Sequence, residues 1–391
     1  MAIVLFDNLN FKSLYPLTQT RAIADLPLGI VTISQWWQLQ TTQQVFIFSQ
    51  DVFHERYEPL PLNQELLWID AALIPDEALL AQIINLKNNE AIADDEGLVA
   101  MRSSIAYQPV YGFHAATGLQ TLATNVTLVN NTRRLQYPHQ IFLWANELMH
   151  RDFELLTKGR TSQPVSSTNN IISGNNIFIE EGAVVEFATI NAGTGPVYIG
   201  KNCTIMEGSC IRGPFAMLDG SVVKMGATIY GATRLGKSCV AGGEIKNAVL
   251  LDYSNKAHHG YLGDSVIGSF CNLGAGTTNS NVKNTCGNVS LYNAATQTSI
   301  NAGFKAGCIM GDYTTTAINT SINTGTVIGI ACNIFGGGFT PKHINNFSWG
   351  LQGQQVNIGK ALVNIERWKK LKGESLTEAE KTILQLIFDQ S

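Results

Sequence analysis

The sequence has little charge and no excess of basic residues. It contains 26 Lys and Arg against 30 Asp and Glu, a formal charge of −4, and charged residues make up 14% of the 391 residues. The missing basic excess argues against nucleic acid or an anionic membrane surface as a partner. So low a charged fraction predicts that part of the surface is buried against sister subunits, and we expect an oligomer.

The sequence also lacks a long apolar segment. No run approaches the ~18 residues that cross a bilayer. The opening residues MAIVLFDN have no basic stretch before their apolar residues and no cleavage-like pattern after them, so a signal peptide is not expected. We expect a soluble, cytoplasmic chain with no membrane partner. Its 391 residues are too many for one ordinary domain, so two domains are predicted.

Cysteine is absent from the first 202 residues, and no two cysteines form a CxxC pair. An odd number without metal-ligand spacing is typical of buried free thiols in a reducing compartment, rather than of disulfides or a metal site. The seven residues are Cys203, Cys210, Cys239, Cys271, Cys286, Cys308 and Cys332.

Residues 1–157 are predicted to form an α/β domain, because short apolar runs alternate with helical patterns. A linker is expected at 158–170, where Ser, Thr and Asn gather from residue 161 onward. The predicted strands are 3–6, 29–33, 45–48 and 66–69, and the predicted helices are 76–86 and 140–156.

Within residues 171–358, an aliphatic side chain returns at every sixth position from Ile199 to Leu235, with glycine and small polar residues between. Such a hexapeptide repeat coils three short strands into a triangular prism with its aliphatic side chains inside, so a left-handed parallel β-helix is predicted. Two amphipathic helices within 359–391 should cover its end, the second opening with Thr377 and Glu380 at capping-box spacing. The regular positions are Ile199, Ile205, Ile211, Met217, Val223, Ile229 and Leu235.

Residues 255–281 hold two adjacent histidines, His258 and His259, in a coil with few other titratable side chains. A neutral imidazole can remove the proton of an attacking amine near neutral pH. The alternative is that both histidines only form hydrogen bonds across a subunit interface, since most histidines do no chemistry. The residues alone leave both interpretations open.

The words KAHHGYLGDSVIG and NLGAGTTNSN resemble the acetyltransferase half of a bifunctional family, the N-acetylglucosamine-1-phosphate uridylyltransferase/glucosamine-1-phosphate acetyltransferases. The phrases EGSCIRGPFAMLDGSVVKMGATIYGAT and GGEIKNAVLLDYSNKAHHGYLG are still more similar to a divergent bacterial branch of sugar nucleotidyltransferases. The resemblance is specific around the histidines and extends more loosely over residues 171–338.

The resemblance implies a role for several residues near the histidines. His258, three residues before the tyrosine of YLGD, would be the catalytic base, and Tyr261 and Asn281 would orient the sugar. Asn272 matches a further family asparagine that binds the substrate. Lys246, twelve residues before His258, matches the lysine that holds the sugar phosphate.

The family also has a substrate arginine, one coil upstream of its lysine. Arg234 is the nearest candidate in this sequence, although it stands in a different register.

The stretch SLYPLTQTRAIADLPLGI resembles the opening of the family's nucleotidyltransferase domain. That domain uses a glycine-rich loop so that backbone N–H groups approach phosphates closely, but residues 8–12 contain no glycine here. Either Lys12 and Arg21 supply the phosphate contacts, or the domain has lost turnover and serves for binding or packing. Asp70 would hold Mg²⁺ as a family aspartate does, unless it is only a turn residue at a strand end.

As a whole, the resemblance implies acetyl transfer from acetyl-CoA to an amino-sugar 1-phosphate such as glucosamine-1-phosphate. If the first domain is catalytically active, a nucleotidyl transfer would then form a UDP-sugar, as in UDP-N-acetylglucosamine biosynthesis. Such prisms resemble homotrimers with active sites between subunits. Two rivals remain, a nucleotidyltransferase with the prism only as a trimerising scaffold and a non-catalytic sugar-nucleotide sensor. The acyl donor, the sugar epimer and the nucleotide base stay open.

Overall fold

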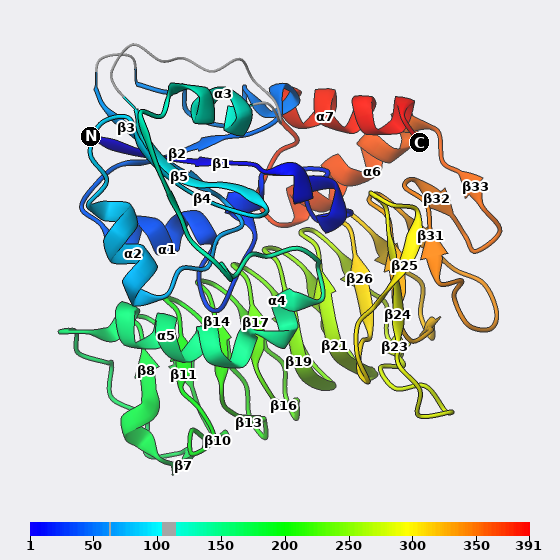
Figure 1. Cartoon of the computed structure of the whole chain (residues 1–391). Coiled ribbons are helices and arrows are strands. Elements are labelled where there is room, and N and C mark those ends of the chain that lie inside the picture. Colours follow the sequence, from blue (N-terminus) through cyan, green and yellow to red (C-terminus); the bar gives the residue numbers. More distant parts are fainter. Residues whose placement is uncertain (62–63, 104–114) are drawn as a thin grey trace. The chain divides into compact units, whose positions relative to one another are not determined.

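A computed structural model gives the structure of the chain and describes residues 1–61, 64–103 and 115–391. The chain forms two compact units (Figure 1). This division differs from the predicted one, because residues 138–170 and two short early segments belong to the second unit. Unit 1 comprises Met1–Leu14, Thr20–Pro27 and Val31–Tyr137, and unit 2 comprises Tyr15–Gln19, Leu28–Ile30 and Pro138–Ser391.

Unit 1 is a mixed six-stranded sheet with the strand order β2-β1-β3-β5-β4-β6. β1 pairs in parallel with β2 and β3, and β5 runs antiparallel to β3 and β4. Its strands are β1 (Ala2–Phe6), β2 (Val45–Phe48), β3 (Leu66–Asp70), β4 (Glu90–Asp94), β5 (Gly97–Ser103) and β6 (Asn125–Leu128). Its helices are η1 (Leu9–Leu14), η2 (Ile23–Asp25), α1 (Ile33–Gln40), η3 (Asp51–Phe53), α2 (Glu77–Ile84) and α3 (Ala115–Leu122).

The predicted strands at 3–6, 45–48 and 66–69 and the helix at 76–86 are confirmed. The predicted strand at 29–33 is wrong. The backbone of Ile30 bonds to side chains instead of to a strand: its N–H donates to Asp152 Oδ2 at 2.8 Å, and its carbonyl accepts from Arg234 Nε at 2.8 Å. The helix α1 then begins at Ile33, capped by Thr32.

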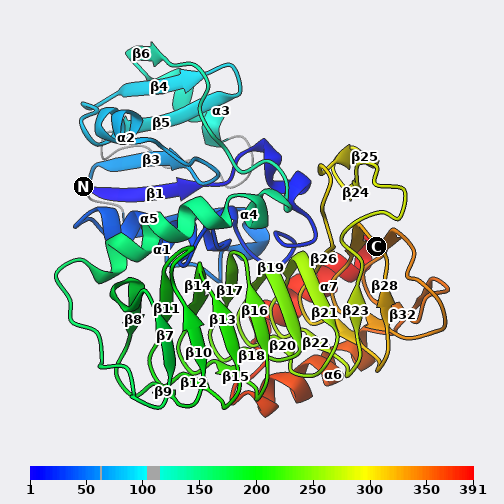
Figure 2. The same ribbon diagram turned by 90° about the horizontal axis from the view of Figure 1, so that it is seen from below.

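Unit 2 is a left-handed parallel β-helix with three faces, as predicted (Figures 1 and 2). The first face contains β7 (Asn170–Ile172), β10 (Thr189–Asn191), β13 (Cys210–Arg212), β16 (Thr228–Tyr230), the starts of β19 (Glu244–Leu250) and β21 (Tyr261–Ile267), β23 (Thr278–Asn279) and β28 (Ser321–Ile322). The second face contains β8 (Ile177–Ile179), β11 (Val197–Ile199), β14 (Phe215–Met217), β17 (Thr233–Leu235), the ends of β19 and β21, β26 (Cys308–Met310), β29 (Thr326–Ile328) and β31 (His343–Ile344).

The third face has two-residue strands. They are β9 (Val184–Val185), β12 (Thr204–Ile205), β15 (Val222–Val223), β18 (Val240–Ala241), β20 (Asn255–Lys256), β22 (Asn272–Leu273), β27 (Thr315–Thr316), β30 (Asn333–Ile334) and β32 (Ser348–Trp349), with β33 (Gln354–Gln355) antiparallel at the end. A hairpin of β24 (Ser290–Asn293) and β25 (Thr298–Asn301) and the short η4 (Gly174–Asn176) complete this part of the chain.

The interior of the prism confirms the hexapeptide pattern. The seven aliphatic residues from Ile199 to Leu235 are all at most 2% exposed and belong to one continuous core. Because these residues are six positions apart, each one points inward from the next face of the prism. Between faces the chain turns at residues with positive φ, among them Asn247 and Asp264, which divide β19 and β21 between the first and second faces.

Four helices belong to unit 2: α4 (Gln140–Leu143), α5 (Ala145–Thr157), α6 (Ile358–Leu371) and α7 (Glu378–Asp389). The helix predicted at 140–156 is thus divided at Trp144. The two C-terminal helices and the capping box of Thr377 with Glu380 are confirmed. Across the part of the chain that is described, no helix combines the length and the apolar character needed to cross a membrane.

All seven cysteines are free thiols, as predicted. Burial is confirmed for five, but Cys210 and Cys286 are exposed. Cys210 is at an outward position of the first face, beside the inward Ile211, and Cys286 lies in the loop after β23. No group of three or more His, Cys, Asp or Glu side chains in the described ranges is arranged to hold a metal ion.

Candidate active site

The first face of the prism aligns the outward side chains of neighbouring strands in two rows. β16, β19 and β21 pair in parallel, so that Thr228, Glu244 and Tyr261 form one row. Tyr230, Lys246 and Gly263 form the second row. Strand alternation therefore brings residues about 16 positions apart in the sequence to ~5 Å spacing on one surface.

Tyr261 lies across the position of Gly263 in the second row. A Cβ atom at Gly263 would be 2.2 Å from the Tyr261 hydroxyl oxygen, so this position must be glycine for the ring to lie there. The hydroxyl oxygen accepts a hydrogen bond from Asn281 Nδ2 at 3.1 Å. Burial, together with the nearby Asp264 carboxylate, raises the pKa of Tyr261, which stays a neutral hydroxyl that can donate a hydrogen bond to a ligand.

Asp264 lies at the corner after the first face and is hydrogen-bonded to Asn281, which follows β23. Its Oδ2 accepts from Asn281 Nδ2 at 2.5 Å, and its Oδ1 accepts from Asn247 Nδ2 at 2.7 Å. Asp264 is 5% exposed. The two amides hold its carboxylate, and Asn281 is thereby fixed against both Asp264 and Tyr261.

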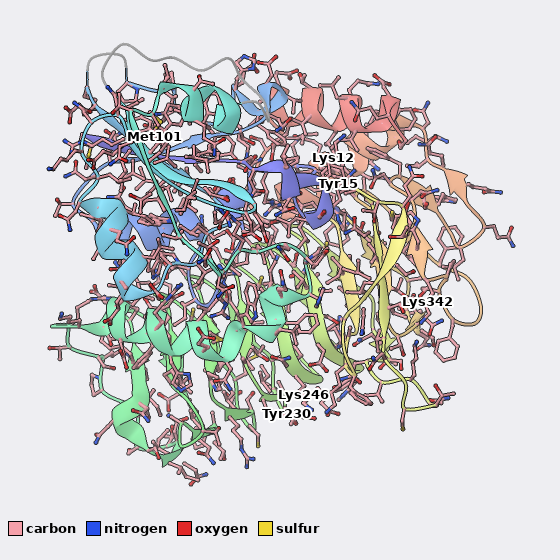
Figure 3. All side chains as sticks on the ribbon, in the orientation of Figure 1. Lys12, Tyr15, Met101, Tyr230, Lys246 and Lys342 are labelled. Atoms are coloured by element: carbon pink, nitrogen blue, oxygen red, sulfur yellow. The ribbon has the colours of Figure 1, made fainter. Side chains whose placement is uncertain are left out.

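Lys246 and Tyr230 lie side by side on the surface of β19 and β16 (Figure 3). The Lys246 Nζ atom is 5.8 Å from the centre of the Tyr230 ring. The Tyr230 hydroxyl donates to Glu244 Oε1 at 2.6 Å, and this hydrogen bond raises the pKa of Tyr230. Sequence reasoning missed Tyr230, because its position beside Lys246 depends on strand register. It also missed Glu244, which lies two residues before Lys246 on the same strand.

The histidines lie at the corner between the third and first faces, after β20. Both side chains are exposed. The corner is held on both sides by backbone contacts: the carbonyl of His259 accepts from Gly276 N at 3.0 Å, and the carbonyl of Gly260 accepts from Glu244 N at 3.2 Å. The next residue is Tyr261, so His258 stands at the edge of the first face.

We call Tyr230, Glu244, Lys246, His258, Tyr261, Asp264 and Asn281 the first-face site. Four of its members, His258, Tyr261, Asn281 and Lys246, were predicted to act together. Adjacent coils bring Lys246, Tyr261 and Asn281 together on this face, and His258 lies at the corner three residues before Tyr261. Their roles stay predictions.

Two other predicted residues lie elsewhere in unit 2. Asn272 is on the third face, where its Oδ1 accepts from Asn255 Nδ2 at 3.3 Å. Arg234 is on the second face, 2% exposed, with Nη1 bonded to the Leu250 carbonyl at 3.2 Å and Nε to that of Ile30. Burial lowers the pKa of Arg234. The first-face site is therefore built without them.

The register also shows which residue is one coil upstream of Lys246. That position belongs to Tyr230. A guanidinium follows one coil further, because Arg212 continues the outward row on β13 and is exposed. Two strand spacings separate Arg212 from Lys246, about 10 Å between their backbones.

In unit 1, polar side chains gather where the parallel strands β1, β2 and β3 end. We call Asp7, Asn8, Ser49, Asp70 and Arg134 the carboxyl-edge cluster. In α/β sheets this edge is where ligands bind. Here the residues bond mainly to one another and to their own chain, and the glycine-free segment after β1 forms η1.

The Asp70 carboxylate is fully engaged. Asn8 Nδ2 is 2.9 Å from each of its oxygens, and Arg134 Nε donates to Oδ2 at 2.7 Å. The Asn8 amide cannot turn freely, because its Oδ1 accepts from Asn10 N at 2.9 Å. Arg134 also bonds to Asp94. Burial raises the pKa of Asp70, although Arg134 opposes this effect.

These contacts test whether Asp70 suits a Mg²⁺ ion. Mg²⁺ needs carboxylate oxygens with room for waters around it. At Asp70, which is 1% exposed, an amide N–H and a guanidinium take that space, and the guanidinium already supplies the positive charge. The residues do not fit the ion, and we derive no step through it.

The neighbouring Asp7 is satisfied in the same way. Its Oδ1 accepts from Ile23 N at 2.8 Å, and its Oδ2 accepts from the Ser49 hydroxyl. Burial raises the pKa of Asp7 to about 7. Of the predicted phosphate contacts, Lys12 is exposed on η1, whereas Arg21 is buried.

Comparison with known proteins gives matches to parts of the chain. Residues 3–161 match the family model described as sugar nucleotidyl transferase. The bifunctional protein GlmU of Synechococcus elongatus is 30% identical over 157 residues, 39% of this chain and 32% of that protein. GlmU of Pseudoalteromonas atlantica is 30% identical over 171 residues, 39% of this chain and 36% of that protein. The chain thus matches about a third of the length of these relatives.

Among solved structures, the polysialic acid-specific acetyltransferase NeuO is similar at 11% identity and a TM-score of 0.29, over 53% of this chain and 94% of that one. The O-acetyltransferase OatWY has 18% identity and a TM-score of 0.27. Neither likeness carries an argument at this TM-score. These matches bear out the predicted resemblance: residues 3–161 match the sugar nucleotidyl transferase model, and part of the chain is similar to GlmU proteins.

Proposed function

We propose that the first-face site transfers an acetyl group from acetyl-CoA to the 2-amino group of an amino-sugar 1-phosphate such as glucosamine-1-phosphate. One observation carries the proposal: adjacent coils bring Lys246, Tyr261 and Asn281 onto one face, with His258 at its edge. A basic side chain, two hydrogen-bonding groups that hold each other and an exposed imidazole are the parts that such a transfer needs.

The distribution of charge supports an amino-sugar phosphate as the acceptor. Lys246, and Arg212 beyond Tyr230, would hold the phosphate, since both are cations in the same outward row. The acids Glu244 and Asp264 lie toward Tyr261 and favour the amine end of the sugar. Such an acceptor carries one anionic and one basic group and matches both ends.

The reaction would proceed by general-base catalysis. The amine nitrogen attacks the thioester carbonyl carbon, and the His258 imidazole accepts the proton that the nitrogen releases. The tetrahedral intermediate collapses with cleavage of the carbon–sulfur bond, and the proton passes to the thiolate. The products are an amide and free coenzyme A. Tyr261 and Asn281 would orient the sugar.

A homotrimer in the cytoplasm is part of this proposal. Three large apolar side chains are exposed on the corner that also carries His258, namely Phe187 (63%), Met225 (69%) and Ile318 (70%). Exposed apolar residues repeated along one edge favour burial against a sister subunit. The acetyl-CoA would then lie beside this corner.

A second candidate function is nucleotidyl transfer to the acetylated sugar phosphate in unit 1, with a UDP-sugar as product. The match of residues 3–161 to the sugar nucleotidyl transferase model favours it. The engaged state of Asp70 argues against a mechanism that depends on Mg²⁺ at that residue.

The first experiment is a thiol-release assay with acetyl-CoA and glucosamine-1-phosphate. It uses the wild type, His258→Ala and, as matched control, a substitution of the neighbouring and also exposed histidine, His259→Ala. We expect His258→Ala to lose at least ~100-fold in kcat/KM, the scale of a general base, and His259→Ala to keep most of the rate. Light scattering on the same preparation should give three chains of 42.5 kDa.

Two outcomes would contradict the proposal. If wild type releases no thiol but releases pyrophosphate from UTP and N-acetylglucosamine-1-phosphate, unit 1 is the enzyme and the prism is a scaffold. If neither assay gives turnover while a UDP-sugar still binds, the protein is a sensor.

A further inference from the structure

The interior of the prism contains one lysine next to the candidate base. Lys256 is the second residue of β20, an inward position where its partner on β18 is Ala241. The side chain is 0% exposed, among the aliphatic residues of the core. A charged side chain in such a place is costly and rarely retained without a partner or a function.

The ammonium of Lys256 contacts backbone carbonyls. Nζ donates to the carbonyl oxygen of Gly242 at 3.3 Å and, more closely, to the carbonyl oxygen of His258. The same His258 oxygen is packed against Gly243, where a Cβ atom would be only 2.6 Å away and φ is +72°. The His258 peptide therefore directs its carbonyl into the prism, while its imidazole is exposed.

Few charged groups surround this lysine. His258 and His259 follow it on its own corner, Lys224 lies beside Gly242 in the preceding coil, and Glu244 follows Gly243 on β19. No acidic side chain of the described ranges forms an ion pair with Lys256. Burial lowers its pKa to about 8, so it remains mostly protonated at pH 7.

We propose that Lys256 is a positioning residue for His258, whose ammonium is bonded to the His258 carbonyl oxygen and fixes the backbone that carries the imidazole. The inference rests on the proposed function of His258. It assigns a reason to a buried lysine that the first-face site does not otherwise use.

The proposal implies that activity and stability change in opposite directions. Because the folded pKa of about 8 lies below the ordinary 10.5, the folded state binds fewer protons between these values. The destabilising effect of the buried charge is therefore full below pH 8 and disappears as the pH rises toward 10.5. Replacing the lysine by an apolar residue of similar volume should not lower the melting temperature at pH 7.

The test compares Lys256→Met, which removes donor and charge, with Lys256→Gln, which keeps a donor. Thiol release is followed from pH 5.5 to 9, with the melting temperature of each variant. We expect Lys256→Met to lose roughly 10–100-fold in kcat/KM at pH 7, with KM little changed. Lys256→Gln, which can still donate to the His258 carbonyl oxygen, should keep more of the rate than Lys256→Met.

The nuclear magnetic resonance signal of the His258 C2–H, assigned with His258→Ala, gives a readout that does not depend on turnover. A His258 signal that shifts or broadens in Lys256→Met and returns toward the wild-type position in Lys256→Gln supports the proposal even if the acceptor has been misidentified. An unchanged signal together with wild-type kcat/KM would overturn it. So would an equal loss of rate in both variants with a lowered melting temperature, which indicates a purely structural lysine.

Discussion

The carboxyl-edge cluster of unit 1 and the first-face site of unit 2 contain similar residue types and treat them in opposite ways. In unit 1, the oxygens of Asp70 and Asp7 are taken by Asn8, Arg134, the Ser49 hydroxyl and backbone N–H groups. In unit 2, the second-row cation and the imidazole at the corner face solvent.

The difference teaches what distinguishes a structural polar cluster from a reactive one. Buried polar groups must be hydrogen-bonded, and a cluster that satisfies itself has no capacity left for a ligand. The first-face site satisfies only its supporting groups, because Asn281 and Asn247 hold the Asp264 carboxylate. Lys246 and His258 keep their donor and acceptor capacity for a substrate.

The largest effect should come from Asp70→Asn. It removes one of the two close charged partners of a buried guanidinium, so we expect a loss of about 3–5 kcal/mol in the free energy of unfolding. Urea denaturation measures it, with the exposed Asp51→Asn as control. Electron paramagnetic resonance with Mn²⁺ should show no site that depends on Asp70. If the wild type binds Mn²⁺ and Asp70→Asn does not, Asp70 is a metal ligand and the contrast between the two clusters is wrong.

A comparable effect of opposite sign, which depends on pH, should come from Asp7→Asn. The folded pKa of about 7 exceeds the ordinary 3.8, so the wild type loses stability as the pH rises from 3.8 to 7. The amide can keep both hydrogen bonds and does not ionise. We expect the variant to be more stable by about 4 kcal/mol at pH 8 and nearly equal at pH 4, from melts at both values. Equal differences at both would show that Asp7 is ionised throughout.

The smallest effect should come from Lys246→Met in the first-face site. An exposed ion pair with phosphate contributes modestly, so KM for glucosamine-1-phosphate should rise ~10-fold, about 1.4 kcal/mol, with kcat nearly unchanged. The exposed Lys201→Met is the control. Glucosamine without phosphate should not distinguish variant from wild type. A fall in kcat with unchanged KM would instead give Lys246 a part in the chemistry.

Much of the fold could be predicted from the sequence, because the hexapeptide spacing is a local pattern. The residues from Ile199 to Leu235 are inward as expected. The strand predicted at 29–33 failed because its hydrogen bonds go to Asp152 and Arg234, more than 100 residues away. No local pattern contains that information. For the same reason, Cys210 reads as buried from composition but lies outward on β13.

The residues of the candidate site also fall into two groups, those that a local sequence pattern marks and those that only folding brings together. His258, Tyr261 and Asn281 are marked by sequence words, since they lie within 24 residues of one another. Tyr230 and Arg212 belong to other coils, and only strand register shows that they share a face with Lys246. Lys256 reads as an ordinary polar residue of its coil until its burial is known.

The sequence by itself determined the two-part architecture, the prism and its inward residues, since these follow from periodicities that each segment carries alone. The tertiary structure decided which polar side chains are engaged and which are open. Asp70 and Arg234 look like ligand-binding residues in the sequence but are occupied by distant partners. The physical reason is that hydrogen-bond satisfaction depends on groups brought together only by folding.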